Sequence, residues 1–132
     1  MTDAELISFA EKWIAYWSAP ENSQERKALS WVSDHEYDLM QEEPEQIWRL
    51  ILAVLHRNSS NKIQEVLSAG PLEDLLAKHG EAVIEKVETE AISNPLFAQL
   101  LGGVWRNSMT NEIWARVQVV SDKRGWDGIP EA

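Results

Sequence analysis

The sequence predicts an all-α fold of short helices, and three observations support this prediction. Apolar residues recur at spacings of three and four in successive segments, which is the period of an amphipathic helix. Proline, glycine and asparagine separate these segments, as expected at helix ends. No segment shows the sustained apolar–polar alternation of a half-buried strand, and the one apolar run that suggests a strand, 117–120, also fits helical spacing.

The first helix is predicted from the residues after Thr2 to the approach of Pro20. Thr2 and Glu5 have the spacing of a capping box, in which a hydroxyl and a carboxylate bind the free amides at a helix start. Pro20 ends the segment because the residue before a proline disfavours the helical conformation. One apolar face is formed by Leu6, Phe9, Ala10, Trp13, Ile14 and Trp17.

Three further helices are expected before residue 61. A weaker one covers 25–32, and the spacing of Ser33 and Glu36 predicts a second capping box that starts a short helix there. Pro44 suits the first turn of a longer helix, where its missing N–H would be unpaired in any case. That helix ends near the polar turn 58–61, and its apolar positions are Ile47, Trp48, Ile51, Leu52 and Leu55.

The second half of the chain is punctuated by glycine, proline and asparagine. A short helix after residue 61 should stop at Gly70, and Pro71 should start the next one. His79–Gly80 is typical of a helix C-terminus, and Asn94–Pro95 of a helix start. Gly102–Gly103 should break the chain before a last helix that begins near residue 110.

Short helices joined by short turns indicate antiparallel neighbours. We therefore expect one compact multi-helix domain over residues 1–132, with 125–132 as a loose C-terminal tail. A compact irregular bundle satisfies this pattern, and so do stacked helical hairpins, as in a short α-solenoid. No clear internal repeat favours the solenoid.

The composition restricts the function. The absence of cysteine excludes disulfides, thiolate metal sites and a cysteine nucleophile. Twelve Lys and Arg face 22 Asp and Glu, and the resulting formal charge of −10 repels nucleic acid and anionic membranes. The longest apolar stretch, Leu50–Leu55, is too short to cross a membrane, and the acidic start lacks the basic region of a secretory signal. We expect a cytoplasmic protein.

Catalytic or metal chemistry finds little support among the residues. His35, Glu36 and Asp38 could in principle ligate a divalent ion, but no second histidine lies nearby and no ligand motif is present. The three histidines lie in different segments, and no nucleophile elbow or phosphate loop occurs. We therefore expect no metal, no cofactor and no enzymatic activity.

The acidic stretch 34–45 is the most distinctive charged segment, because it contains no Lys or Arg. It is either a docking face for a basic partner or a solvated helix face, and the sequence leaves both interpretations open. Trp31 directly precedes the stretch, and an exposed tryptophan commonly anchors a partner. The candidate partner-binding residues are Trp31, Asp34, Glu36, Tyr37, Asp38, Glu42 and Glu43.

Size, charge and the missing catalytic motifs together favour a binding protein. By analogy, such a chain is typical of an immunity or inhibitor protein that neutralises a basic bacterial protein, such as a toxin nuclease, by occluding its active cleft. A phage-encoded inhibitor or DNA mimic that blocks a nucleic-acid-binding host protein uses the same charge. An adaptor or assembly subunit, with self-association, is the third alternative.

The segment from residue 69 to 105 also resembles a family of small uncharacterised bacterial helical domains. The resemblance implies a helical fold in a bacterial or phage setting, and no established activity, cofactor or catalytic residue comes with it. The first forty residues lie outside it. The residues that carry it are Ala69–Leu76, His79–Gly80, Ile84, Val87–Glu88, Asn94–Phe97, Leu100–Leu101 and Val104–Trp105, with support from Trp48–Leu55 and Ile113–Val117.

Overall fold

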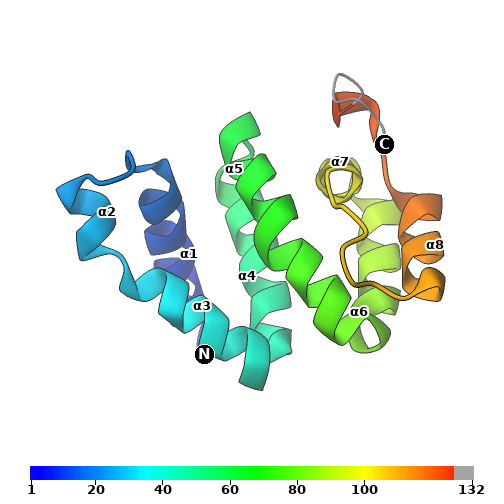
Figure 1. Cartoon of the computed structure of the whole chain (residues 1–132), viewed down its shortest axis with the longest axis horizontal. Coiled ribbons are helices and arrows are strands. Elements are labelled where there is room, and N and C mark those ends of the chain that lie inside the picture. Colours follow the sequence, from blue (N-terminus) through cyan, green and yellow to red (C-terminus); the bar gives the residue numbers. More distant parts are fainter. Residues whose placement is uncertain (127–132) are drawn as a thin grey trace. The chain divides into compact units, whose positions relative to one another are not determined.

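The structure is a computed structural model that describes residues 1–126. Throughout these residues the regular elements are helices, without a strand, so the predicted all-α fold is confirmed (Figure 1). The run 117–120, which suggested a strand, belongs to a helix. The chain divides into two compact units, unit 1 (Met1–Val66) and unit 2, which begins at Leu67. That 1–132 is a single domain stays a prediction.

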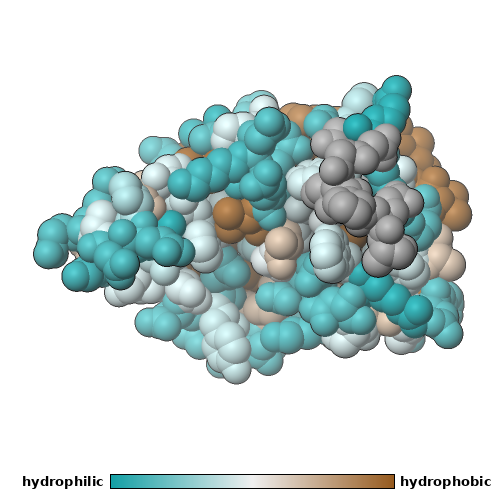
Figure 2. Space-filling model, turned by 45° about the horizontal axis from the view of Figure 1, so that its top comes forward, coloured by the Kyte–Doolittle hydropathy of each residue, from teal (hydrophilic) through white to brown (hydrophobic). Residues whose placement is uncertain are grey.

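Unit 1 is organised around the contact of its first helix with its fourth. The helix α1 packs against α4 and α3, and α3 also packs against α4. The short α2 buries none of its residues, and the surface at that end of the view is largely hydrophilic (Figure 2). The elements are α1 (Asp3–Ser18), α2 (Gln24–Ala28), α3 (Trp31–Glu42), α4 (Pro44–Arg57) and α5 (Asn61–Leu67), which reaches the boundary with unit 2. The core includes Phe9, Trp13, Val32, Ile47, Leu50, Ile51 and Val54.

The predicted start of α1 is confirmed in detail. The backbone N–H of Thr2 donates to Oε1 of Glu5 at 2.8 Å, and the N–H of Glu5 donates to Oγ1 of Thr2 at 3.1 Å. The hydrogen bond from the Thr2 backbone, followed by the interaction of the Thr2 side chain with the carboxyl, lowers the pKa of Glu5 below its usual value. Pro44 occupies the first turn of α4, as predicted.

The predicted second capping box is wrong. The helix α3 begins at Trp31, two residues before Ser33, and Ser30 is its N-cap residue without a side-chain bond. Burial of Val32 against the core holds the first turn of α3 in place, so the helix does not need a cap at Ser33. The Glu36 carboxylate accepts a hydrogen bond from Trp13 instead.

Unit 2 is built around a long bent helix. The helix α6 packs against α8, α7 and η1, and η2 packs against α7. Its elements are the π-helical turn η1 (Ser68–Leu72), α6 (Glu73–Ser93), α7 (Pro95–Gly102), α8 (Asn111–Val120) and the 3₁₀ turn η2 (Arg124–Trp126). The core includes Leu72, Leu75, Leu76, Ile84, Val87, Phe97, Leu100, Leu101, Ile113 and Val117.

The predicted helix break at Gly70–Pro71 is wrong, because the chain stays helical through the proline. The N–H of Glu73 donates to the carbonyl of Ser68, five residues back, which is π-helical spacing. Proline has no N–H and crowds the carbonyl four residues before it. A wider turn relieves that crowding, so Pro71 is accommodated within the helical segment rather than ending it.

The predicted stop at His79–Gly80 is a kink. His79 has a non-helical backbone (φ −131°, ψ 25°), but α6 continues beyond it to Ser93. None of the described glycines has a positive φ, so Gly80 does not act as a left-handed cap. A Cβ atom on Gly80 would lie 3.0 Å from Cγ1 of Ile113, so the glycine allows α8 to approach α6 closely.

The predicted start of a helix at Asn94–Pro95 and the predicted break at Gly102–Gly103 are confirmed. The Asn94 side chain accepts hydrogen bonds from the backbone of the first turn of α7, and α7 ends at Gly102. Gly125 and Trp126, which were predicted in a loose tail, belong to η2, where Nε1 of Trp126 donates to the Gln99 carbonyl at 2.7 Å. The rest of the predicted tail, 127–132, lies outside the described residues.

The turn before η2 contains a carboxylate, Asp122, whose pKa depends on Arg124. Hydrogen bonds from the Arg124 side chain and backbone lower the pKa of Asp122 from its usual 3.8 to about 2. Because this pKa is depressed on folding, its contribution to stability is complete above pH 3.8 and is lost as the pH falls to about 2. We expect Arg124→Gln to return the Asp122 pKa toward 3.8 in a carboxyl-carbon NMR titration.

Lys123→Gln is the control for this titration. Lys123 lies next to Arg124, but its ammonium donates to Gln118 and does not bind Asp122. We expect the Asp122 pKa to be unchanged in this variant. A wild-type Asp122 that titrates near 3.8 would contradict the Arg124 bond.

Candidate functional site

The exposed side of α3 carries a row of carboxylates. Asp34, Asp38 and Glu42 follow one another at intervals of four residues, which places them on one face of the helix. All three are exposed, whereas Val32 and Leu39 point from the opposite face into the core. We call these three carboxylates the α3 acidic row.

The α3 acidic row has no cationic partner within residues 1–126. No hydrogen bond or ion pair engages the side chains of its three residues in that part of the chain. The arginines of unit 1 are used elsewhere: Arg26 donates to the Ala19 carbonyl, Arg49 pairs with Asp3 at 2.8 Å, and Arg57 lies 3.8 Å from Glu11. Like charges four residues apart cost a helix about 0.2–0.5 kcal/mol per pair. Local stability therefore does not account for the row.

Glu36 does not belong to this row, although it was predicted with it. It is half-buried on the inner side of α3, where its Oε1 accepts a hydrogen bond from Nε1 of Trp13 at 2.6 Å. Trp13 is fully buried, so Glu36 supplies the partner that a buried indole N–H requires. The role of Glu36 is to join α1 to α3 within the core.

The two predicted aromatic anchors are both exposed. Tyr37 is 63% exposed on the outer side of α3, beside the acidic row. Trp31 is 45% exposed, and its ring centroid lies 6.0 Å from that of the buried Phe9. Phe9 also meets His35 edge to face at 4.7 Å. Trp31, Phe9 and His35 therefore form one wall of aromatic rings at the surface.

This aromatic wall lines a groove between α1 and α3. The groove has a volume of about 590 Å³. It opens to the surface of unit 1, and Glu43, the last of the predicted site residues, lies on its edge. We call it the α1–α3 groove, and its lining residues are Met1, Ala4, Glu5, Ser8, Phe9, Trp31, His35, Leu39, Glu43 and Gln46.

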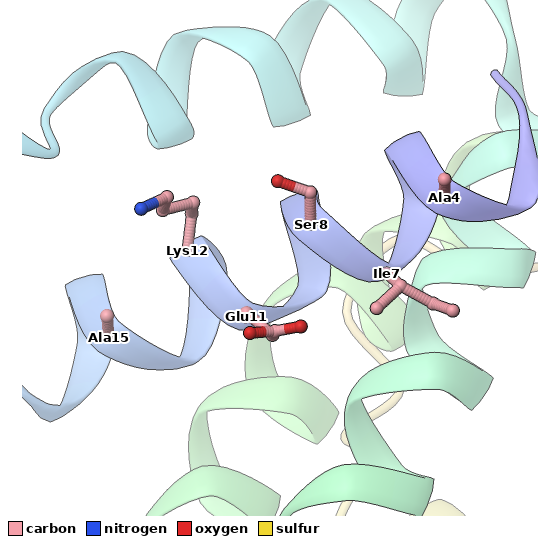
Figure 3. Close-up of a pocket in the computed structure, with 6 residues that line it drawn as sticks. All are labelled: Ala4, Ile7, Ser8, Glu11, Lys12 and Ala15. Carbon is pink, nitrogen blue, oxygen red and sulfur yellow. The ribbon is translucent and has the colours of Figure 1, made fainter.

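A second depression, of about 570 Å³, runs along the outer face of α1. All its lining residues come from this one helix, and Figure 3 shows that their side chains do not converge: Ser8 and Lys12 project to one side, Ile7 and Glu11 to another. Without side chains from a second element, it offers no arrangement that could orient a ligand.

The candidate metal ligands of the sequence do not converge. His35 faces Phe9, Glu36 faces Trp13, and Asp38 lies in the acidic row. Within residues 1–126, no group of three or more His, Asp or Glu side chains is arranged to hold a metal ion. Over the same residues, no helix has the length and apolarity needed to cross a membrane.

One prominent surface residue of unit 2 was not among the predicted site residues. Trp105 is 68% exposed, more than Trp31, and lies between α7 and α8. Its backbone N–H donates to Oε1 of Glu73 at 3.1 Å, and Asn107 donates to Oε2 of the same carboxylate. The segment that displays Trp105 is thus tied to α6 through a backbone hydrogen bond of Trp105 and a side-chain amide hydrogen bond of Asn107.

Fold and surface together define an all-α protein in which an exposed acidic face of α3, unpaired within residues 1–126, lies beside an aromatic groove. The chain belongs to the family of unknown function DUF6869, whose family model matches residues 19–125. The resemblance to an uncharacterised family is therefore confirmed, and the match extends further than predicted, because it includes α2 and α3 from the first forty residues. No curated protein and no solved structure matches the chain.

Proposed function

We propose that this chain is a cytoplasmic, non-catalytic binding protein that neutralises a basic protein by covering its cationic cleft. Its action would be that of an immunity or inhibitor protein against a toxin nuclease. The observation that carries the proposal is the α3 acidic row, which is exposed and unpaired within residues 1–126. Unpaired charges at a surface are free to complement those of a partner.

Electrostatics supports this function in two ways. The formal charge of −10 creates a long-range attraction for a cationic protein, and such steering raises association rates at low salt. At close range, a nuclease cleft must carry positive charge to hold phosphates. Carboxylates spaced by helical turns can occupy that cleft, and nucleic acid is then excluded by both volume and charge.

The test is a capture experiment with two charge-matched variants of the full chain. In the row variant, Asp34→Asn, Asp38→Asn and Glu42→Gln remove three charges from α3. In the control variant, Glu81→Gln, Glu85→Gln and Glu112→Gln remove three charges from exposed positions in unit 2. Both variants have the same net charge, so a difference between them reports position rather than total charge.

We expect wild type and control variant to retain the same basic protein from a lysate of the native host, and the row variant to lose it at physiological salt. The purified partner should then bind wild type more weakly as ionic strength rises, because surface charges are screened within about 8 Å at 0.15 M salt. Equal retention by both variants would show that the row is only a solvated helix face.

A further inference from the structure

The α1–α3 groove has the construction of a site for a planar cation. Trp31 presents a half-exposed ring against Phe9, so one aromatic face is held in position and open to solvent. Aromatic faces attract cations, and tryptophan does so most strongly. The same unit contains a working example: the Arg26 guanidinium lies 4.9 Å from the ring centroid of Tyr16 and 5.2 Å from that of Trp17.

The edges of the groove carry negative charge. Glu43 is exposed at the C-cap of α3, and no side-chain hydrogen bond or ion pair engages it within residues 1–126. Glu5 lies on the α1 side, where its capping bonds with Thr2 favour the ionised carboxylate. The nearby Arg49 donates to Gln46 and pairs with Asp3, so its charge is already balanced by a carboxylate.

We propose that the α1–α3 groove receives an arginine-containing segment of the basic partner, with one guanidinium against the Trp31 ring and another paired with Glu43, which lies twelve residues further along the chain. Arginine fits better than lysine because its planar group stacks on a ring and binds a carboxylate through two N–H groups, whereas an ammonium is a compact, strongly hydrated charge. The inference rests on the proposed function for the class of partner. It adds the residue type that the groove selects.

The test uses capped peptides of alternating glycine and arginine, and lysine counterparts of equal length and charge. They are titrated into the isotopically labelled full chain, and the indole N–H signals are followed by NMR. We expect the arginine peptide to shift the Trp31 signal saturably and to bind several-fold more tightly than the lysine peptide. Trp31→Ala should lower affinity for the arginine peptide roughly five-fold and abolish its advantage over lysine.

Two further variants separate the groove from the rest of the surface. Glu43→Gln, a conservative change at an exposed position, should weaken the arginine peptide more than the lysine peptide. Trp105→Ala removes an even more exposed tryptophan in unit 2 and should leave both peptides unaffected. Helical content measured by circular dichroism checks that Trp31→Ala still folds, and Glu43→Gln tests the groove independently of that check.

The outcomes distinguish the two proposals. Equal affinity for both peptides, with no effect of Trp31→Ala, overturns the arginine site; if the row variant then weakens both peptides equally, the acidic-face function stands. Arginine preference that depends on Trp31 but survives the loss of the α3 acidic row supports the groove, and the capture experiment with the row variant then decides the role of the row separately. Absence of any binding by the arginine peptide overturns the groove proposal.

Discussion

Replacing Gly102 with alanine is expected to destabilise unit 2 by about 3 kcal/mol. A Cβ atom at this position would lie 2.0 Å from the carbonyl oxygen of Asp122 and 2.7 Å from its carbonyl carbon. Backbone atoms cannot rotate away as a flexible side chain can, so the segment after α8 has to move. That movement breaks the hydrogen bond from the Asp122 N–H to the Ala98 carbonyl.

Urea denaturation, followed by far-ultraviolet circular dichroism, measures this loss. Gly70→Ala is the matched control, because nothing apart from its two neighbours in the chain comes within 4 Å of the Cβ that alanine would add there. We expect the control to lose much less stability than Gly102→Ala, because its added Cβ crowds only the ring of Pro71 and alanine also reduces the conformational entropy of the unfolded chain. Equal stability of the two variants would contradict the close passage of residue 122 over the end of α7.

Replacing Trp13 with alanine is expected to cost unit 1 about 3–5 kcal/mol. The side chain is fully buried in the core of unit 1, and its loss leaves a cavity where an indole stood. The same change removes the donor of the 2.6 Å hydrogen bond to Glu36, so the half-buried carboxylate loses this bond. Thermal and urea denaturation of the full chain measure the combined effect.

Two further variants separate the cost of the cavity from the cost of the lost hydrogen bond. Trp13→Phe keeps most of the ring volume and removes the N–H, so its cost of about 1–3 kcal/mol reports chiefly the bond to Glu36. Trp105→Ala removes a tryptophan that is 68% exposed and should change stability by less than about 0.5 kcal/mol. A Trp13→Phe variant as stable as wild type would show that Glu36 does not hold α1 to α3 through this bond.

Within the candidate site, local pattern predicted the charge but not its arrangement. The acidic stretch is evident in the sequence, and helical spacing alone places Asp34 and Asp38 on one face. Glu36 lies between them in the sequence and has the same charge, yet it faces Trp13, twenty-three residues away along the chain. Its role depends on the packing of α1 against α3, which no spacing within the stretch reveals.

The α1–α3 groove was even harder to predict from the sequence than the role of Glu36. Its wall combines Phe9 of α1 with Trp31 and His35 of α3, and Glu43 completes the edge. The sequence indicated Trp31 as an anchor from its position beside the acidic stretch. It contained no signal that Phe9, one of several apolar residues on an amphipathic helix, would support that ring at the surface.

What the sequence determined by itself is local: the all-α class, the capping box of Thr2 and Glu5, the start of α7 at Asn94–Pro95, and the excess of negative charge. These follow from hydrogen bonds and periodicity over a few residues. The tertiary structure determined the conformation at Pro71 and the packing role of Gly80. A proline that should end a helix lies in a π-helical turn, and a glycine that should cap one makes room for Ile113, because contacts between distant elements outweigh local preference.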